Sequence, residues 1–283
     1  MRTEQEMTDL ILNVANENPN IRLVMMNGSR VNPNIEKDSL QDFDIVYYVK
    51  DIASFSNDRE WIDVFGERLI MQTLDDMIFD PVPESKDYVY LMQFNDGNRI
   101  DLTIRDILHV HDDLNEDSLS MILLDKDTLI KHPITPNESS YFVEKPSKAI
   151  FDSCLNELYW VSLYVVKGII RDEFVYAVDH LNIVRNCLKG LLDWYIAEQF
   201  SFNVSVGKNC KRYKELLPIT LYLRFISTYS IKDYDEILSS LYNCLELANE
   251  IALKVSFVLR YDYDETVHES IIDYIHKLTE DYL

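Results

Sequence analysis

A proline-rich segment at residues 131–147 separates two parts of the chain that differ in hydrophobic periodicity. The segment reads KHPITPNESSYFVEKPS and combines three prolines with several turn-forming residues, so a regular helix or strand is not expected to run through it. Before it, short apolar runs alternate with helical stretches, and after it apolar residues recur about every 3.6 positions. We therefore predict an α+β fold: a domain at 1–135 with a mixed β-sheet flanked by helices, a linker at 136–147, and an α-helical bundle domain at 148–283.

The first part carries patterns for one helix and several strands. Thr3 and Glu6 have the spacing of a capping box, which predicts that a helix begins there. An Asp-Gly turn between two alternating apolar runs predicts a hairpin. The expected strands cover 21–26, 42–49, 89–94 and 99–104, with the last two forming that hairpin.

The acidic composition restricts the partners. Lys and Arg total 27 against 49 Asp and Glu, which gives a formal net charge of −22. Such a surface repels a phosphate backbone, so a DNA or RNA substrate is disfavoured, whereas a small polycation is attracted. An acidic surface that merely keeps the protein soluble explains the same charge. The charge alone therefore leaves both interpretations open.

Cysteine spacing and hydropathy favour the cytoplasm. The sequence shows no apolar run typical of a secretory signal in its first ten residues, and charges interrupt its apolar stretches well before ~20 residues. We expect a cytoplasmic protein with no membrane partner. The cysteines are far apart without a C-x-x-C pair, so we expect reduced thiols at Cys154, Cys187, Cys210 and Cys244.

Three aspartates on predicted strands are candidates for a metal site. Asp42 and Asp44 open the run DFDIVYYV, where alternation directs both side chains to one face with Cα atoms ~6.6 Å apart. Asp101 takes the equivalent place in RIDLTI, facing away from the core together with Arg99 and Thr103. Carboxylates at such a spacing can share Mg²⁺. An isolated D-x-D is more often an exposed acidic pair, so the interpretation depends on the three side chains converging.

A Gly-Ser turn adds a second element to this pattern. Gly28 and Ser29 directly follow the predicted strand 21–26, and twelve residues separate them from Asp42. Glycine allows a phosphate to approach the backbone, where N–H groups and a serine hydroxyl can bind it. The order of strand, Gly-Ser, spacer, strand with D-x-D and later acidic strand resembles the DNA polymerase β-like nucleotidyltransferase superfamily.

Seven further segments narrow the resemblance to the aminoglycoside 6-adenylyltransferase family. They occur in order across most of the chain, and Asn27 stands where members often carry an acid before the glycine. The segments are LQDFDIVYYV (40–49), FGERLIMQ (65–72), IDLTI (100–104), LLDKD (123–127), YVVKG (164–168), AVDHLNIVR (177–185) and VGKNCKRYK (206–214).

The resemblance implies transfer of AMP from ATP to the 6-hydroxyl of a streptomycin-type aminoglycoside, with release of pyrophosphate and resistance to the drug. It implies two Mg²⁺ ions held by Asp42, Asp44 and Asp101. Asp101 is the favoured general base and also a contact to the acceptor. A nucleotidyltransferase with another acceptor, such as a lincosamide or a protein hydroxyl, is the first alternative. An inactive nucleotide-binding, antitoxin-like module is the second.

The remaining candidates carry charge toward the substrates. Asp179 is a candidate for binding a cationic group of the drug, although a surface or helix-capping role is equally open. A monomer or weak dimer is expected. For the triphosphate and nucleotide, the candidates are Gly28, Ser29, Arg30, Arg185, Lys208 and Lys211, with solvated surface cations as the alternative for the basic residues.

Other polar and aromatic residues are expected to be structural. His180 is expected to be a satisfied structural histidine. His109 and His111 form an H-x-H pair, for which a loop after the third strand is favoured over zinc. Trp160 and Trp194 are assigned to helix packing. Glu84, 112–117 and 262–265 are assigned to solvated faces.

Overall fold

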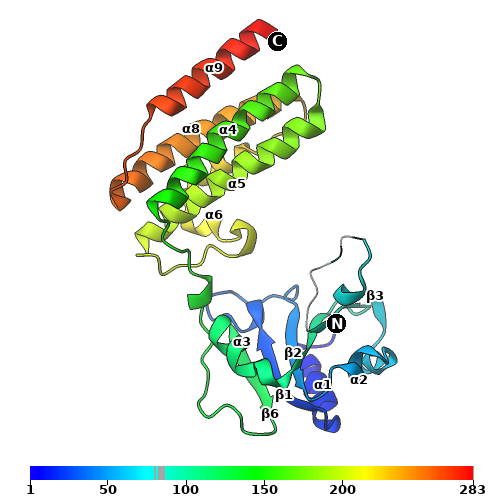
Figure 1. The fold of residues 1–283 in the computed structure, drawn as a ribbon. Helices are drawn as coiled ribbons and strands as arrows, with labels where there is room; N and C mark the ends of the chain where they lie inside the picture. The colour runs from blue at the N-terminus through cyan, green and yellow to red at the C-terminus, as the bar shows by residue number, and fades with distance from the viewer. Residues whose placement is uncertain (80, 82–86, 283) are drawn as a thin grey trace. The chain divides into compact units, whose positions relative to one another are not determined.

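The computed structural model describes residues 1–79, 81 and 87–282, so Glu84 lies outside the described residues. The chain divides into two compact units, Met1–Ser140 and Tyr141–Leu283, each drawn in Figure 1. The boundary falls inside the segment 136–147, for which a linker is expected.

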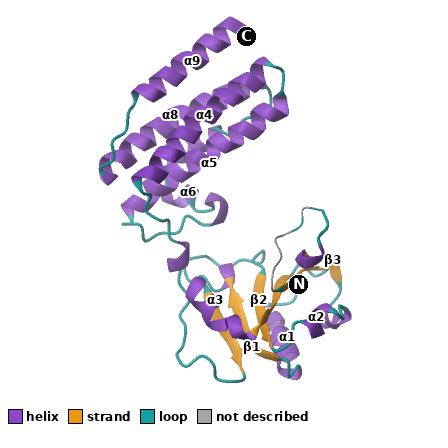
Figure 2. Ribbon diagram, viewed as in Figure 1, coloured by secondary structure: helices purple, strands orange, loops and turns teal. Residues whose placement is uncertain are grey.

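Unit 1 is built on a mixed six-stranded sheet, shown in orange in Figure 2, with the strand order β3-β4-β5-β2-β1-β6. Strands β2 and β5 are parallel neighbours, and the other neighbouring pairs are antiparallel. The predicted α+β class and mixed sheet are confirmed. The strands are β1 (Ile21–Asn27), β2 (Phe43–Val49), β3 (Arg68–Thr73), β4 (Tyr88–Phe94), β5 (Arg99–Asp106) and β6 (Ser120–Asp125).

Helices cover the two faces of this sheet unequally. Helix α1 (Glu4–Glu17) starts with the predicted capping box between Thr3 and Glu6 and packs its buried residues into the main core of unit 1. The opposite face has a smaller apolar cluster, in which Val110 of α3 (Val110–Glu116) packs with Leu23, Met25 and Tyr48. That cluster covers one end of the face only, because the strand positions at the other end are polar.

Two boundaries differ from the prediction. The stretch around His109 and His111 is helical, with a 3-10 turn at Ile107–His109 followed by α3, where a loop was expected. This helix is too short to show a 3.6-residue periodicity in the sequence. Strand β2 begins at Phe43, so Asp42 lies just before the strand rather than in it. Two short elements, α2 (Ala53–Ser56) and a 3-10 stretch at Glu60–Phe65, precede β3.

Unit 2 is helical, as predicted. Its core is continuous through α4, α5 and α8, each of which buries one face of apolar residues that repeat at helical spacing. None of the described helices is long and apolar enough to cross a membrane. The assignment of Trp160 to packing is wrong, because its side chain is 59% exposed, whereas Trp194 packs against the core. The helices are α4 (Lys148–Ile170), α5 (Phe174–Gln199), α6 (Tyr213–Leu216), α7 (Ile219–Ser227), α8 (Tyr234–Leu259) and α9 (Thr266–Tyr282).

Candidate active site

A row of polar side chains crosses the less covered face of the unit 1 sheet. In the strand registers, Asp44 on β2 lies beside Asp101 on β5 and opposite Asn27 on β1, which in turn lies opposite Ser120 on β6. Residues that are directly paired between neighbouring strands project from the same face. Asp101 therefore shares a face with Asp44, as the alternation predicts. Ile45 and the other alternate residues of β2 and β5 are buried on the opposite face.

Arg99 connects the carboxylates at the edge of this row. Its guanidinium donates to both carboxylate oxygens of Asp101, from Nε at 2.7 Å and from Nη2 at 2.8 Å. Its Nε also lies 3.6 Å from Oδ2 of Asp42. The bonds to Asp101 raise the pKa of the Arg99 guanidinium above its ordinary value. The sequence analysis placed Arg99 and Asp101 on one face at i and i+2 but missed the arginine as a site residue.

Gly28 allows the Asp44 carboxylate to lie against the turn after β1. Its φ is +75°, a left-handed value that favours glycine, and an added Cβ would lie 2.3 Å from Oδ2 of Asp44. The N–H of Gly28 donates to the carbonyl of Leu119, so it is used by the fold rather than directed at an anion. The structure thus gives Gly28 a steric role, to admit a carboxylate, and phosphate binding by the backbone of this turn stays a prediction.

Asn27 lies next to Asp44 in this row. Its Nδ2 donates to Asp117 and to Ser120, both at 2.9 Å. Its Oδ1 is buried and has no hydrogen-bond partner among the described residues. The position before Gly28 therefore contributes a neutral acceptor beside the carboxylates.

Arg30 belongs to the opposite side of the sheet. Its guanidinium donates to the backbone carbonyls of Gln41, at 2.6 Å, and Asp42, at 3.0 Å, and lies 3.7 Å from the centre of the Phe43 ring. Phe43 faces the core under α1, and burial lowers the pKa of Arg30. These contacts hold the segment that leads into β2, which replaces the triphosphate contact expected from sequence.

Arg185 is also buried, inside unit 2. Its Nε donates to the carbonyl of Thr228 at 2.8 Å, Nη1 donates to Asn182, and its guanidinium lies 4.5 Å from the centre of the Tyr229 ring. Burial lowers the pKa of this guanidinium, and its Nη2 has no partner among the described residues. A side chain that is only 2% exposed cannot act as the surface cation expected from sequence.

The other expected contacts of unit 2 lie on its surface. Asp179 is exposed on α5, and Lys208 and Lys211 are exposed around a short 3-10 turn. His180, next to Asp179, has its Nδ1 2.7 Å from the carbonyl of Tyr176, and its ring packs against that of Tyr164. This is the structural role expected for that histidine.

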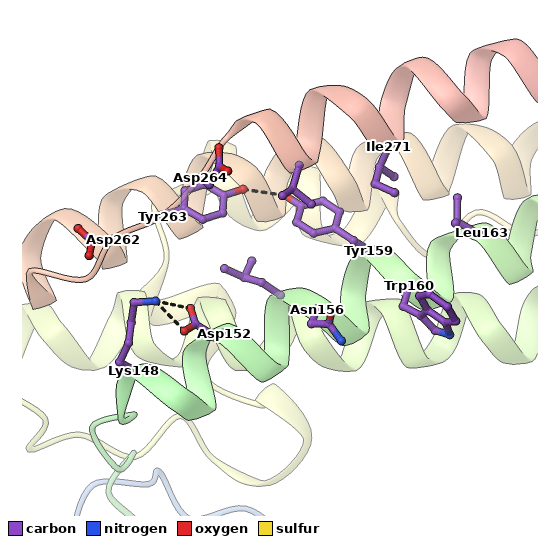
Figure 3. Close-up of a pocket in the computed structure, with 12 residues that line it drawn as sticks. Lys148, Asp152, Asn156, Tyr159, Trp160, Leu163, Asp262, Tyr263, Asp264 and Ile271 are labelled. Atoms are coloured by element: carbon purple, nitrogen blue, oxygen red, sulfur yellow. Dashed lines mark hydrogen bonds and ion pairs between the residues drawn. The ribbon is translucent and has the colours of Figure 1, made fainter.

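Two of the cavities among the described residues lie near features discussed above, and neither was expected from the sequence. One, of about 450 Å³, lies in unit 1 on the face that carries Asp101, and it is lined by Ile70, Met71, Gln72, Leu91, Gln93 and Arg99. Finding it requires the register of β3 and β4, which the sequence does not provide. The other, of about 610 Å³, lies in unit 2 between α4 and α9. Figure 3 shows its wall, with a Lys148–Asp152 ion pair and a hydrogen bond between the hydroxyls of Tyr159 and Tyr263.

The donor atoms of the acidic row suit a hard cation, but their arrangement does not form a complete ligand set. Asp42, Asp44 and Asp101 offer the carboxylate oxygens that Mg²⁺ prefers. In the part of the chain that the structure describes, no three His, Cys, Asp or Glu side chains are grouped closely enough to hold a metal ion. The guanidinium of Arg99 instead binds both oxygens of Asp101. The chemistry of the site fits Mg²⁺ provided that this pairing opens.

Comparison with known proteins gives matches along almost the whole chain. The family described as streptomycin adenylyltransferase matches residues 1–278. An aminoglycoside 6-adenylyltransferase of Bacillus subtilis (strain 168) is 42% identical over 272 residues, which cover 94% of this chain and 96% of the relative. A protein of the same name from Campylobacter jejuni is 40% identical over 276 residues, covering 96% of both. The crystal structure of an aminoglycoside 6-adenyltransferase from Bacillus subtilis shares 36% identity over 99% of each chain, with a TM-score of 0.49.

Proposed function

The chain belongs to the streptomycin adenylyltransferase family, and we propose that it transfers AMP from ATP to the 6-hydroxyl of a streptomycin-type aminoglycoside. It is an enzyme of the nucleotidyltransferase class, as are its relatives, which are named aminoglycoside 6-adenylyltransferases. The observation that carries the proposal is the position of Asp101 beside Asp44, on one face of the sheet and next to the Gly28 turn.

Asp42 and Asp44 are the residues that would hold Mg²⁺ in this reaction. Asp44 is fixed against the Gly28 backbone, while Asp42 sits at the entrance to β2, where Arg30 holds its carbonyl. Mg²⁺, when bound, supplies positive charge that offsets the triphosphate and the charge developing at the α-phosphorus. Because both carboxylates lie on one face of the sheet, the phosphates of a metal-bound nucleotide would lie on that face as well.

Asp101 is proposed as the general base. Its carboxylate takes the proton of the acceptor hydroxyl, whose oxygen then forms a bond to the α-phosphorus of ATP. The bond between the α-phosphorus and the bridging oxygen breaks, and pyrophosphate leaves with the electron pair. The cavity lined by Gln72, Leu91 and Gln93 on the same face offers room for the reacting part of the acceptor.

The net charge of the protein supports a cationic acceptor, and exposed charged residues of unit 2 are candidates for binding the substrates. The net charge of −22 favours the approach of an aminoglycoside over that of a nucleic acid. Exposed Asp179 is proposed to bind a cationic group of the drug. In unit 1, Ser29 is proposed to bind the nucleotide. In unit 2, exposed Lys208 and Lys211 are proposed as phosphate-binding cations. Buried Arg30 and Arg185 bind backbone carbonyls, each within its own unit.

The test is a product assay with a panel of acceptors. Purified protein is incubated with ATP, Mg²⁺ and, separately, streptomycin, other aminoglycosides, a lincosamide and a protein acceptor, and products are analysed by mass spectrometry and NMR. AMP is expected on the 6-hydroxyl of streptomycin only. Transfer to another acceptor, or no transfer beside an active control enzyme, contradicts the proposal. An Asp42→Asn variant that retains the full biological effect supports a binding module instead.

A further inference from the structure

The guanidinium of Arg99 occupies the acidic site where a cation is expected. We propose that Arg99 is a nucleotide-binding residue: it binds Asp101 and Asp42 in the nucleotide-free enzyme and moves to the phosphates when metal and nucleotide bind together. The proposal rests on the proposed function, because it assigns a role to Arg99 at the same site. It predicts that the enzyme binds a metal ion weakly on its own and tightly only as the metal–nucleotide complex.

The ion pair between Arg99 and Asp101 occupies both carboxylate oxygens. Both oxygens of Asp101 accept hydrogen bonds from Arg99, at 2.7 and 2.8 Å, and Nε lies 3.6 Å from the Asp42 carboxylate. A carboxylate bound in this bidentate way has its strongest acceptor positions occupied. If Arg99 moves away, the carboxylates of both Asp101 and Asp42 lose their contact with the guanidinium and can bind a metal ion.

Arg99 lies at the edge of a cavity into which its side chain can move. It is the first residue of β5, its side chain is 39% exposed, and it forms part of the wall of the cavity of about 450 Å³. A partly exposed ion pair contributes little to folding free energy, because water competes for both partners. Movement of this side chain into the cavity therefore costs the fold little.

The balance of charge at the site differs between a metal ion alone and a metal–nucleotide complex. The guanidinium already neutralises part of the charge of these carboxylates. A metal ion that arrives alone must displace the guanidinium, which weakens the net attraction of the metal ion to the site. A metal ion arriving with a triphosphate brings the anion that the displaced guanidinium can bind, since arginine binds phosphate as readily as carboxylate. The exchange keeps every charge paired, so metal and nucleotide favour each other's binding.

The test measures metal binding without any reaction. Mn²⁺ is titrated into the nucleotide-free full-length protein and followed by electron paramagnetic resonance, for the wild type, Arg99→Gln and Arg99→Lys. Binding of a non-hydrolysable ATP analogue with Mg²⁺ is measured by calorimetry on the same proteins. Arg105→Gln is the matched control, since it removes a guanidinium from the same face of the same strand, away from the Gly28 turn.

Two opposite changes are expected for Arg99→Gln. Mn²⁺ alone should bind roughly 10-fold more tightly, because three carboxylates remain and their guanidinium is gone. The Mg²⁺–analogue complex should bind roughly 10-fold more weakly, because a phosphate contact is lost. Arg99→Lys, which keeps the charge but loses the fork, should fall between wild type and Arg99→Gln in both assays, and Arg105→Gln should leave both affinities unchanged.

Unchanged or weaker Mn²⁺ binding in Arg99→Gln would overturn the proposal, as would tighter binding of both ligands. Thermal unfolding checks that each variant is folded, and Arg99→Lys carries the test if Arg99→Gln is not. Asp42→Asn in the Arg99→Gln background tests the proposed carboxylate metal site separately from the role of Arg99. If that double variant binds Mn²⁺ as well as Arg99→Gln does, the proposed carboxylate site itself is wrong, whatever the role of Arg99.

Discussion

Arg99 and Arg105 project from the same face of β5, and each binds two aspartates, but only one of these clusters lies at an open site. Arg105 pairs with Asp87 and with Asp113, whose side chains are each 12% exposed. In the Arg99 cluster, Asp101 and Asp42 are 22% and 36% exposed. The two clusters have the same chemical groups and differ in how completely water and free space have been excluded.

The Arg105 cluster is closed by its neighbours. Asp113 lies on α3 and also accepts a hydrogen bond from the hydroxyl of Tyr48, which packs in the apolar cluster under that helix. Burial, followed by that bond, raises the pKa of Tyr48, and the bond to Asp87 raises the pKa of Arg105. Such a network fixes α3 on the sheet. The Arg99 cluster instead borders a cavity and the Gly28 turn, where a ligand has room to enter. An arginine–aspartate cluster therefore indicates function through its surroundings rather than its composition.

The largest expected effect is on catalysis, when a carboxylate of the open site is removed. Asp44→Asn should lower the rate of AMP transfer by about 10³-fold or more, because an amide cannot replace a metal-binding carboxylate next to Gly28. The measurement is the rate of pyrophosphate release at saturating substrates. Asp112→Asn is the matched control, since it removes the same charge from an exposed position on α3. Near wild-type turnover by Asp44→Asn would show that the carboxylates of the open site, like those of the Arg105 cluster, have no part in catalysis.

For folding stability the larger effect is expected in the Arg105 cluster and the smaller one in the Arg99 cluster. Arg105→Gln leaves Asp87 and Asp113 without their guanidinium in a largely buried place, which should cost about 2 to 4 kcal/mol of unfolding free energy. Arg99→Gln should cost less than about 1 kcal/mol, since its partners are more exposed. Urea unfolding of the full chain, followed by circular dichroism, measures both. Equal losses would remove the distinction between the clusters.

A half-buried carboxylate in unit 2 extends the comparison to a site where no arginine among the described residues binds the carboxylate. Asp193 on α5 accepts a hydrogen bond from the hydroxyl of Tyr213, and burial raises its pKa to about 6. A folded-state pKa above the unfolded value means that this group stabilises the fold fully at low pH and loses that contribution as pH rises through about 6.

Asp193→Asn should therefore gain stability relative to the wild type as pH increases from about 4 to 7, by on the order of 2 kcal/mol. Paired urea titrations across this range measure the difference. A difference between the two proteins that does not change with pH would show that Asp193 titrates as an exposed aspartate does.

Local patterns in the sequence predicted local structure well. The Thr3–Glu6 capping box, the Asp-Gly hairpin and the alternation around Asp44 and Asp101 all correspond to the structure, because each is set by residues close in the chain. The shared face of Asp44 and Asp101 additionally required β2 and β5 to be neighbours. That adjacency is a property of the topology, which only the resemblance to known nucleotidyltransferases supplied.

The roles of charged side chains were harder to predict. Arg30 and Arg185 look like surface cations in the sequence, but both side chains are buried. Arg30 donates to the backbone carbonyl of Gln41, in the loop before β2, and Arg185 donates to that of Thr228, far along the chain. Nothing in their own neighbourhoods indicates those partners. Arg99 is the reverse case, since its spacing from Asp101 was visible in the alternation. The exposed Trp160 was assigned to packing because helical periodicity does not show where a neighbouring helix stops covering a face.

The role of Asp101 is the claim on which the mechanism depends most. The direct measurement is the single-turnover rate of AMP transfer to streptomycin by Asp101→Asn, with binding of the Mg²⁺–ATP analogue measured in parallel. The expected result is a rate lowered about 10²- to 10⁴-fold with the acceptor bound, as for loss of a general base. Transfer by Asp101→Asn at the wild-type rate would contradict the account, because the carboxylate beside Asp44 would then have no part in the chemistry.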